Sequence, residues 1–177
     1  MIQAEIGGAA RVTPGFGVQK PGCLIRDFTL MSSRGENLGI SSFRSRSNLA
    51  VVFPGISDAM LAFAGEAVRH ASEFSEQDTT VLVVVPHGPE SEAIAAAGNS
   101  PVIVLYDETH HAYRLSGAMD ESARPIPVVY LTDRFGEIAE TYVAPDRQMP
   151  PSVAEILSAL EFLNYQCPEC EPPEWPQ

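Results

Sequence analysis

The sequence predicts an α/β domain in three layers, with a central mixed β-sheet and helices on both faces. Short apolar runs rich in β-branched residues alternate with segments whose apolar residues recur at spacings of three and four. This alternation is typical of parallel strands, because a helix must carry the chain back between them. Near the end of the chain a short turn joins two strands instead, which makes the sheet mixed. At 177 residues the chain can form one domain with a substantial core.

Several segments have the composition of strands, being short, apolar and bounded by turn-forming residues. In chain order they are residues 27–30, 49–53, 81–85, 101–106, 127–131 and 137–143. A turn at 33–36 follows the first of them. Asp133 and Gly136 bound the turn between the last two, which predicts a hairpin whose glycine takes the left-handed conformation.

The first helix is expected directly after strand 49–53, which Pro54 and Gly55 end. Ser57 or Asp58 can cap it, because either side chain accepts hydrogen bonds from the free N–H groups of a first turn. Its apolar residues form one stripe: Leu61, Ala64, Val68, Ala71 and Phe74.

The last helix has the clearest start in the chain. Ser152 and Glu155 have the spacing of a capping box, in which each side chain bonds the other residue's backbone N–H. The expected buried stripe is Val153, Ile156, Leu157, Leu160 and Leu163. Two further helices are predicted over residues 89–97 and 108–115.

The formal charge is −12, from 23 acidic and 11 basic residues. An acidic surface repels phosphate backbones and anionic lipids, so we expect neither nucleic acid nor a membrane surface as a partner. No apolar run approaches the ~20 residues of a transmembrane helix. The start of the sequence lacks a basic region followed by an apolar stretch, so a cytoplasmic protein is expected.

Five stretches, taken in order, resemble one family. They are residues 20–30, the Leu-Ala-Val-Val-Phe-Pro run at 49–54, Pro-Glu-Ser at 89–91, Asp107 with 113–117, and 128–138. This order resembles the peroxiredoxins, in the branch of alkyl hydroperoxide reductase and thiol-specific antioxidant (AhpC/TSA, redoxin). The resemblance implies a thioredoxin-like sandwich and an antioxidant thiol oxidoreductase. It divides the chain into a lead-in at 1–20, a redoxin domain at 21–164 and a tail at 165–177.

The chemistry of that family requires a thiolate in the first turn of the helix after the Phe-Pro strand end, where the helix dipole stabilises its charge. The family pattern is Pro, three residues, Thr or Ser, two residues, Cys. Counted from Pro54, Asp58 stands in the threonine position and Leu61 in the cysteine position. No cysteine lies between Leu24 and Gln166. We therefore expect little or no peroxidase activity from this loop.

Two residues near strand 127–131 have counterparts in the family. Ile126-Pro127 falls where thioredoxin-like proteins carry a cis-proline facing the active site, so a cis bond is expected. Arg124 lies close to the position of the arginine that stabilises the peroxiredoxin thiolate. Because no thiolate is present to stabilise, Arg124 is interpreted as a surface residue.

The histidines and the first cysteine are weaker candidates. His87 follows the carboxyl end of a strand, near where α/β proteins bind ligands. His110 and His111 are adjacent and point in different directions on a helix, so both are interpreted as exposed. Cys23 is interpreted as a small buried hydrophobic residue.

The tail carries the only motif with chemistry of its own, the Cys-x-x-Cys pair of Cys167 and Cys170. It could be a redox or resolving pair, but it follows the negative end of the last helix and lies among acids, which both favour the protonated thiol. It could instead be half of a zinc site, which a second chain or a histidine would complete. Trp175 and the tail prolines favour a third reading, an extended strap on the domain or on a partner subunit.

Two function classes follow. The first is a thiol oxidoreductase or atypical peroxidase that uses Cys167 and Cys170, with an unknown redox partner. The second is a non-catalytic binding or dimerisation module, for which the partner can be a second copy of the chain in a homodimer. No cofactor is expected, with zinc at the tail pair as the alternative.

Overall fold

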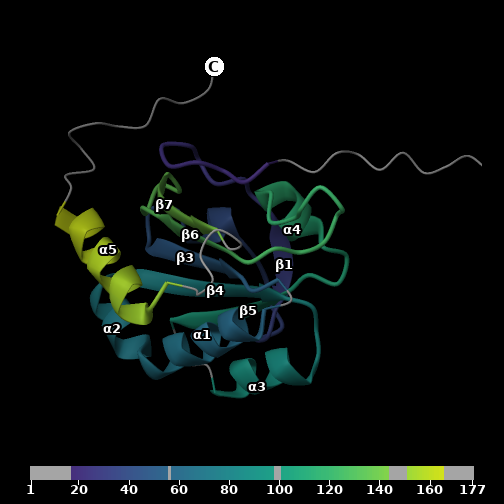
Figure 1. Ribbon diagram of the computed structural model, residues 1–177. Helices are drawn as coiled ribbons and strands as arrows, with labels where there is room; N and C mark the ends of the chain where they lie inside the picture. The colour runs from purple at the N-terminus through teal and green to yellow at the C-terminus, as the bar shows by residue number, and fades with distance from the viewer. Residues whose placement is uncertain (1–16, 56, 98–100, 144–150, 166–177) are drawn as a thin grey trace, which may run out of the picture.

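The structure is a computed structural model, and it describes residues 17–55, 57–97, 101–143 and 151–165. Its strands form one seven-stranded sheet in the order β2-β1-β5-β4-β3-β6-β7 (Figure 1). The strand bounds are β1 Thr29–Ser32, β2 Asn37–Gly39, β3 Asn48–Phe53, β4 Thr79–Val85, β5 Val102–Tyr106, β6 Val128–Thr132 and β7 Ile138–Val143. The three central strands β3, β4 and β5 are parallel, and every other pair is antiparallel. The predicted mixed sheet is confirmed.

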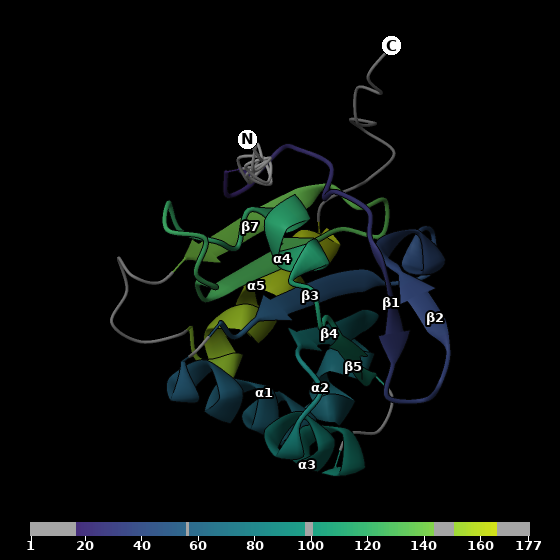
Figure 2. The same ribbon diagram turned by 90° about the vertical axis from the view of Figure 1, so that its right-hand side faces the viewer.

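Helices lie on both faces of this sheet, as expected. Their bounds are α1 Asp58–Arg69, α2 Ala71–Glu76, α3 Pro89–Ala97, α4 His111–Ser116 and α5 Val153–Tyr165, with a 3₁₀ turn η1 at Ile40–Phe43. In Figure 2 α4 lies across the sheet from α1 and α3. In the part of the chain described, every helix is too short or too polar to span a membrane.

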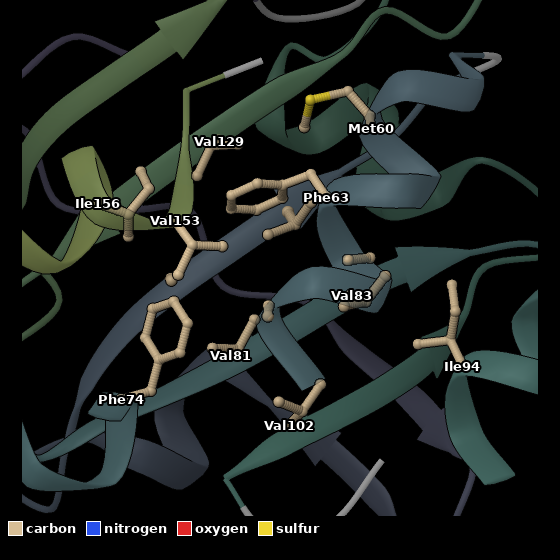
Figure 3. Close-up of a cluster of buried hydrophobic side chains, with 14 of the residues drawn as sticks. Met60, Phe63, Phe74, Val81, Val83, Ile94, Val102, Val129, Val153 and Ile156 are labelled. Carbon is tan, nitrogen blue, oxygen red and sulfur yellow. The ribbon is translucent and has the colours of Figure 1, made fainter. Parts of the chain in front are cut away.

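The sheet separates two buried clusters, because successive side chains of a strand point to opposite faces. On one face α1, α2, α3 and α5 pack against Val81 and Val83 of β4 (Figure 3). On the other face α4 and the segment before β1 pack against Leu82 and Val84. Both sides of β3 and β4 are covered, which explains why these strands read as nearly continuous apolar runs.

The ends of the predicted elements agree with the structure where local chemistry defines them. The capping box of α5 is present: Glu155 Oε2 accepts from the Ser152 N–H at 2.8 Å, and Ser152 Oγ accepts from the Glu155 N–H at 3.2 Å. In the β6–β7 turn Gly136 has φ +89°. Asp133 Oδ1 accepts from the N–H groups of Phe135 and Glu137.

Two strand predictions need correction. The first strand is Thr29–Ser32 and not 27–30. It forms a hairpin with β2, which the sequence did not predict because Asn37–Gly39 has only three residues and no apolar alternation. Ser32 Oγ accepts from the N–H groups of Arg34 and Glu36, which closes the turn between the two strands.

Two helix predictions also differ. The expected stripe from Leu61 to Phe74 is broken, because His70 ends α1 and α2 starts at Ala71. The most buried side chains of the two helices are Met60, Phe63, Ala64, Ala67 and Phe74. The predicted helix 108–115 starts only at His111.

Candidate functional site

The loops that carry most of the candidate residues meet at one edge of the sheet. Since β3, β4 and β5 are parallel, their carboxyl ends lie together there. Because β6 runs antiparallel to β3, with Val128 opposite Phe53, the start of β6 lies at the same edge. The loop after β3 and the Ile126–Pro127 bond are therefore neighbours, although more than seventy residues separate them in the sequence.

Gly55 forms this contact. Its φ is +62°, and a Cβ added there would lie 2.9 Å from the carbonyl carbon of Ile126 and 3.0 Å from the nitrogen of Pro127. Only glycine fits, because both the backbone angle and the distance exclude a side chain. Pro54 is buried and Pro127 half-buried. The isomer of the Ile126–Pro127 bond stays a prediction.

Tyr113 of α4 holds the same loop from the other side. The Gly55 N–H donates to the Tyr113 hydroxyl at 3.1 Å, and that hydroxyl donates to the Val84 carbonyl at 3.0 Å. The Tyr113 ring packs edge-on against Phe53, 5.0 Å between centroids. Burial raises the pKa of Tyr113 well above its usual value, and the charge of Asp107 acts in the same direction. The hydroxyl therefore stays neutral at physiological pH and positions the loop.

The two positions that the resemblance assigns to threonine and cysteine hold Asp58 and Leu61, residues without redox chemistry. Ser57 is the N-cap of α1, its Oγ accepting from the Met60 N–H at 3.4 Å, so the alternative of Asp58 as the cap is wrong. Asp58 is instead the first residue of α1 and is exposed, where its charge interacts favourably with the helix dipole. Leu61 is half-buried and packs against the core beneath α1.

Asp107 explains why α4 starts late. Its buried carboxylate accepts from the N–H groups of His111, Ala112 and Tyr113 at 2.7, 2.8 and 3.2 Å. His110 is left-handed at φ +53°, a conformation that no helical residue can have. Its half-buried ring lies 5.7 Å from that of Tyr113, so the interpretation of both histidines as exposed is correct only for His111.

His87 lies at the same edge, after β4, as the sequence predicted. Its Nε2 is 3.4 Å from Glu92 Oε1, and its backbone N–H donates to Glu108 Oε1 at 2.9 Å. Its ring packs edge-on against Tyr106, 4.7 Å between centroids. Neither glutamate was selected from the sequence. Glu92 lies in the first turn of α3, directly after the loop of His87, whereas Glu108 is brought to His87 by the pairing of β4 with β5. In the described ranges no group of three acidic, histidine or cysteine side chains could hold a metal ion.

Arg124 and Cys23 have no part in this edge's chemistry. Arg124 is exposed, as predicted, and its guanidinium binds Asp120 at 2.7 Å. Cys23 is exposed, so its interpretation as a buried residue is wrong. Its backbone pairs with Ile138 at the outer edge of β7, which leaves the side chain in solvent. Cys167 and Cys170 lie outside the described residues.

Comparisons with known proteins relate this geometry to solved structures. No family model and no curated sequence matches the chain. The reduced 2-Cys peroxiredoxin of Plasmodium vivax superposes with a TM-score of 0.69 at 14% identity, over 82% of each chain. AhpC of Mycobacterium tuberculosis gives 0.66 at 14% identity, over 84% of this chain and 94% of its own. Peroxidoxin BcpB of the same organism gives 0.69 at 14% identity, over 81% of this chain and 97% of its own.

At this level of identity the likeness is one of fold. It agrees with the mixed sheet that carries helices on both faces. The chain therefore has the thioredoxin-like fold in the form found in peroxiredoxins.

Proposed function

We propose that this chain is a peroxiredoxin-fold protein with little or no peroxidase activity, which acts as a non-catalytic binding or dimerisation module. The observation that carries the proposal is Leu61, a half-buried leucine packed on the core in the first turn of α1, where the family's spacing requires cysteine. A leucine has no group that attacks peroxide, and the exposed carboxylate of Asp58 opposes any anion nearby. Because a fold does not define a function, the residues of the site decide.

Cys23 does not supply the missing thiol at this loop. It pairs through its backbone with Ile138, which lies opposite Thr132 at the end of β6. Thr132 in turn lies opposite Leu49, at the start of β3. Cys23 is therefore at the opposite end of the sheet from Gly55 and Leu61.

Dimerisation is supported by the outer edge of β7. β7 is the last strand on this side of the sheet. The segment before β1 contacts it through hydrogen bonds of Gly22 and Cys23 to Ile138 and through the Thr141 hydroxyl, which donates to the Gln19 carbonyl. An edge strand is a template for pairing with another chain. Sedimentation of the purified protein tests this part of the proposal, and a monomer at all concentrations would contradict it.

The test of the main proposal is consumption of hydrogen peroxide and an alkyl hydroperoxide, with dithiothreitol as reductant. The wild type is compared with the double variant Cys167→Ser/Cys170→Ser and with Cys23→Ser. We expect no turnover above that of dithiothreitol alone in any of the three. Turnover that disappears only in the double variant would assign the activity to the tail pair, and the protein would then be a thiol oxidoreductase.

A further inference from the structure

The end of α5 presents an apolar surface that the described fold does not cover. The large apolar side chains with the greatest exposure among the described residues are Tyr165 at 80%, Phe162 at 67% and Met31 at 47%. Phe162 and Tyr165 are three residues apart in the last turn of α5 and therefore share one side of the helix. We call these two side chains the α5 aromatic pair.

The α5 aromatic pair faces away from the core of its own domain. The buried residues of α5 are Val153, Ile156 and Leu160, which form the opposite side of the helix and belong to the core cluster on the sheet. Figure 3 shows Val153 and Ile156 in this cluster. Rotation of the helix would expose these residues, so the core cannot cover both sides. An additional segment is needed to remove Phe162 and Tyr165 from water.

The chain contains such a segment immediately after the helix. Residues 166–177 include Trp175, the only tryptophan of the protein, together with Pro168, Pro172, Pro173 and Pro176. A proline-rich segment in the extended polyproline conformation advances about 3.1 Å per residue, so the ten residues from Tyr165 to Trp175 can span about 30 Å. That length exceeds the roughly 20 Å of a helix with the length of α5. Trp175 can therefore reach the α5 aromatic pair from its own chain.

We propose that residues 166–177 dock on the α5 aromatic pair of the same chain, with Trp175 packed against Phe162 and Tyr165. Proline and tryptophan side chains suit an exposed aromatic surface, because their flat apolar faces stack on rings. The tail is attached directly to the helix, which gives it an effective concentration in the millimolar range relative to its site. A separate chain would have to be present at a comparable concentration to compete with the tail for the α5 aromatic pair. The proposal concerns the tail and α5 alone and does not depend on the proposed function.

The single tryptophan makes the test direct, because the fluorescence emission of Trp175 reports its contact with water. In the full chain we expect emission at shorter wavelength than in the same protein unfolded in urea. The double variant Phe162→Ala/Tyr165→Ala should shift this emission to the unfolded position while its circular dichroism stays native, since both side chains are exposed. The matched control is Met31→Ala, which removes an exposed apolar side chain from β1 and should leave the emission unchanged.

Three results would overturn the proposal. The first is wild-type emission already at the unfolded position, which would mean that Trp175 is in water. The second is short-wavelength emission that persists in the double variant, which would place the tryptophan elsewhere. The third is a shift to long wavelength on dilution of the wild type, which would show that a second copy and not the chain's own tail covers the α5 aromatic pair.

Discussion

Gly55 lies where the loop after β3 meets the start of β6, with its backbone in the left-handed region. Its N–H is bound to Tyr113 of α4, so one residue joins elements from three parts of the chain. A side chain at this position would push Ile126 and Pro127 away from the loop. The change in stability caused by one added methyl group at Gly55 therefore measures how closely the loop packs against the start of β6.

We expect Gly55→Ala to lower the free energy of unfolding by about 1–3 kcal/mol, from left-handed strain and the short contact with Ile126. The matched control is Gly65→Ala in α1, where an added Cβ has no atom within 4 Å. Alanine in a helix interior should raise stability there by up to ~1 kcal/mol. Urea unfolding measures both variants. Equal stability of Gly55→Ala and wild type would contradict the close contact.

Tyr113 makes the stability of the protein fall at alkaline pH. Its pKa is raised by burial in the folded state, whereas an unfolded tyrosine has a pKa of about 10. The folded state thus holds the proton more tightly, so the contribution of Tyr113 is complete below about pH 10 and is lost as the pH rises further. Tyr130 has a pKa raised for the same reason and adds to the effect.

In Tyr113→Phe the loss of stability between about pH 8 and about pH 11 should be smaller than in the wild type. At neutral pH the variant should be less stable by about 1–3 kcal/mol, because the Gly55 N–H and the Val84 carbonyl lose their partner. Denaturant unfolding across this pH range separates the two effects. Parallel pH profiles would show that Tyr113 does not titrate with unfolding.

At the scale of elements, the starts of α1, α4 and α5 are fixed by side chains that bind free N–H groups. Asp107 serves three such groups of α4, and Ser57 serves one of α1. In α5 Ser152 and Glu155 bind each other's N–H groups. The Ser152 and Glu155 spacing was visible in the sequence, whereas the start of α4 was not, because Asp107 lies before a left-handed residue that local patterns do not reveal.

Ser152→Ala should reduce the free energy of unfolding by about 0.5–2 kcal/mol, the usual cost of losing an N-cap side chain. Ser158→Ala is the comparison, an exposed serine within α5 where alanine is the better helix former. It should leave stability unchanged or slightly increase it. Thermal or urea unfolding gives both values. If both substitutions have the same effect, the capping box does not stabilise the helix.

The strands were the most predictable elements, since buried β-branched runs identify β3, β4, β5 and β6 within one or two residues. The hairpin strand β2 was missed because it is held by pairing with β1 and not by its own composition. The break at His70 was also missed, because an apolar stripe continues through it in the sequence. Pairing and packing partners, which are distant along the chain, decided these cases.

For the whole molecule the open question of chemistry concerns the tail pair. From the sequence we expect the acids of the tail and the negative end of α5 to favour protonated thiols at Cys167 and Cys170. In a Cys23→Ser background, alkylation of the reduced, metal-free protein at neutral pH should be no faster than that of a free cysteine. Faster alkylation would overturn the electrostatic argument and support a catalytic dithiol.

Zinc gives a second measurement on the same pair. A thiolate pair that binds a metal releases protons, and acidic neighbours tolerate a bound cation. If the tail is half of a zinc site, the purified chain should retain zinc by elemental analysis and lose it in Cys167→Ser/Cys170→Ser. A zinc-free wild type would leave the disulfide and the strap as the roles of the tail.

The sequence by itself determined the fold class, most strands, the start of α5 and the absence of a cysteine at the position of Leu61, because these depend on local periodicity, capping spacing and residue identity. Only the tertiary structure decided that Gly55 touches Ile126 and Pro127, that Tyr113 holds the same loop, and that Cys23 is exposed at the other end of the sheet. The physical reason is that strand direction and register place residues side by side that are far apart in the chain. Local patterns in a single sequence do not reveal these contacts, because the contacts join residues that are distant along the chain.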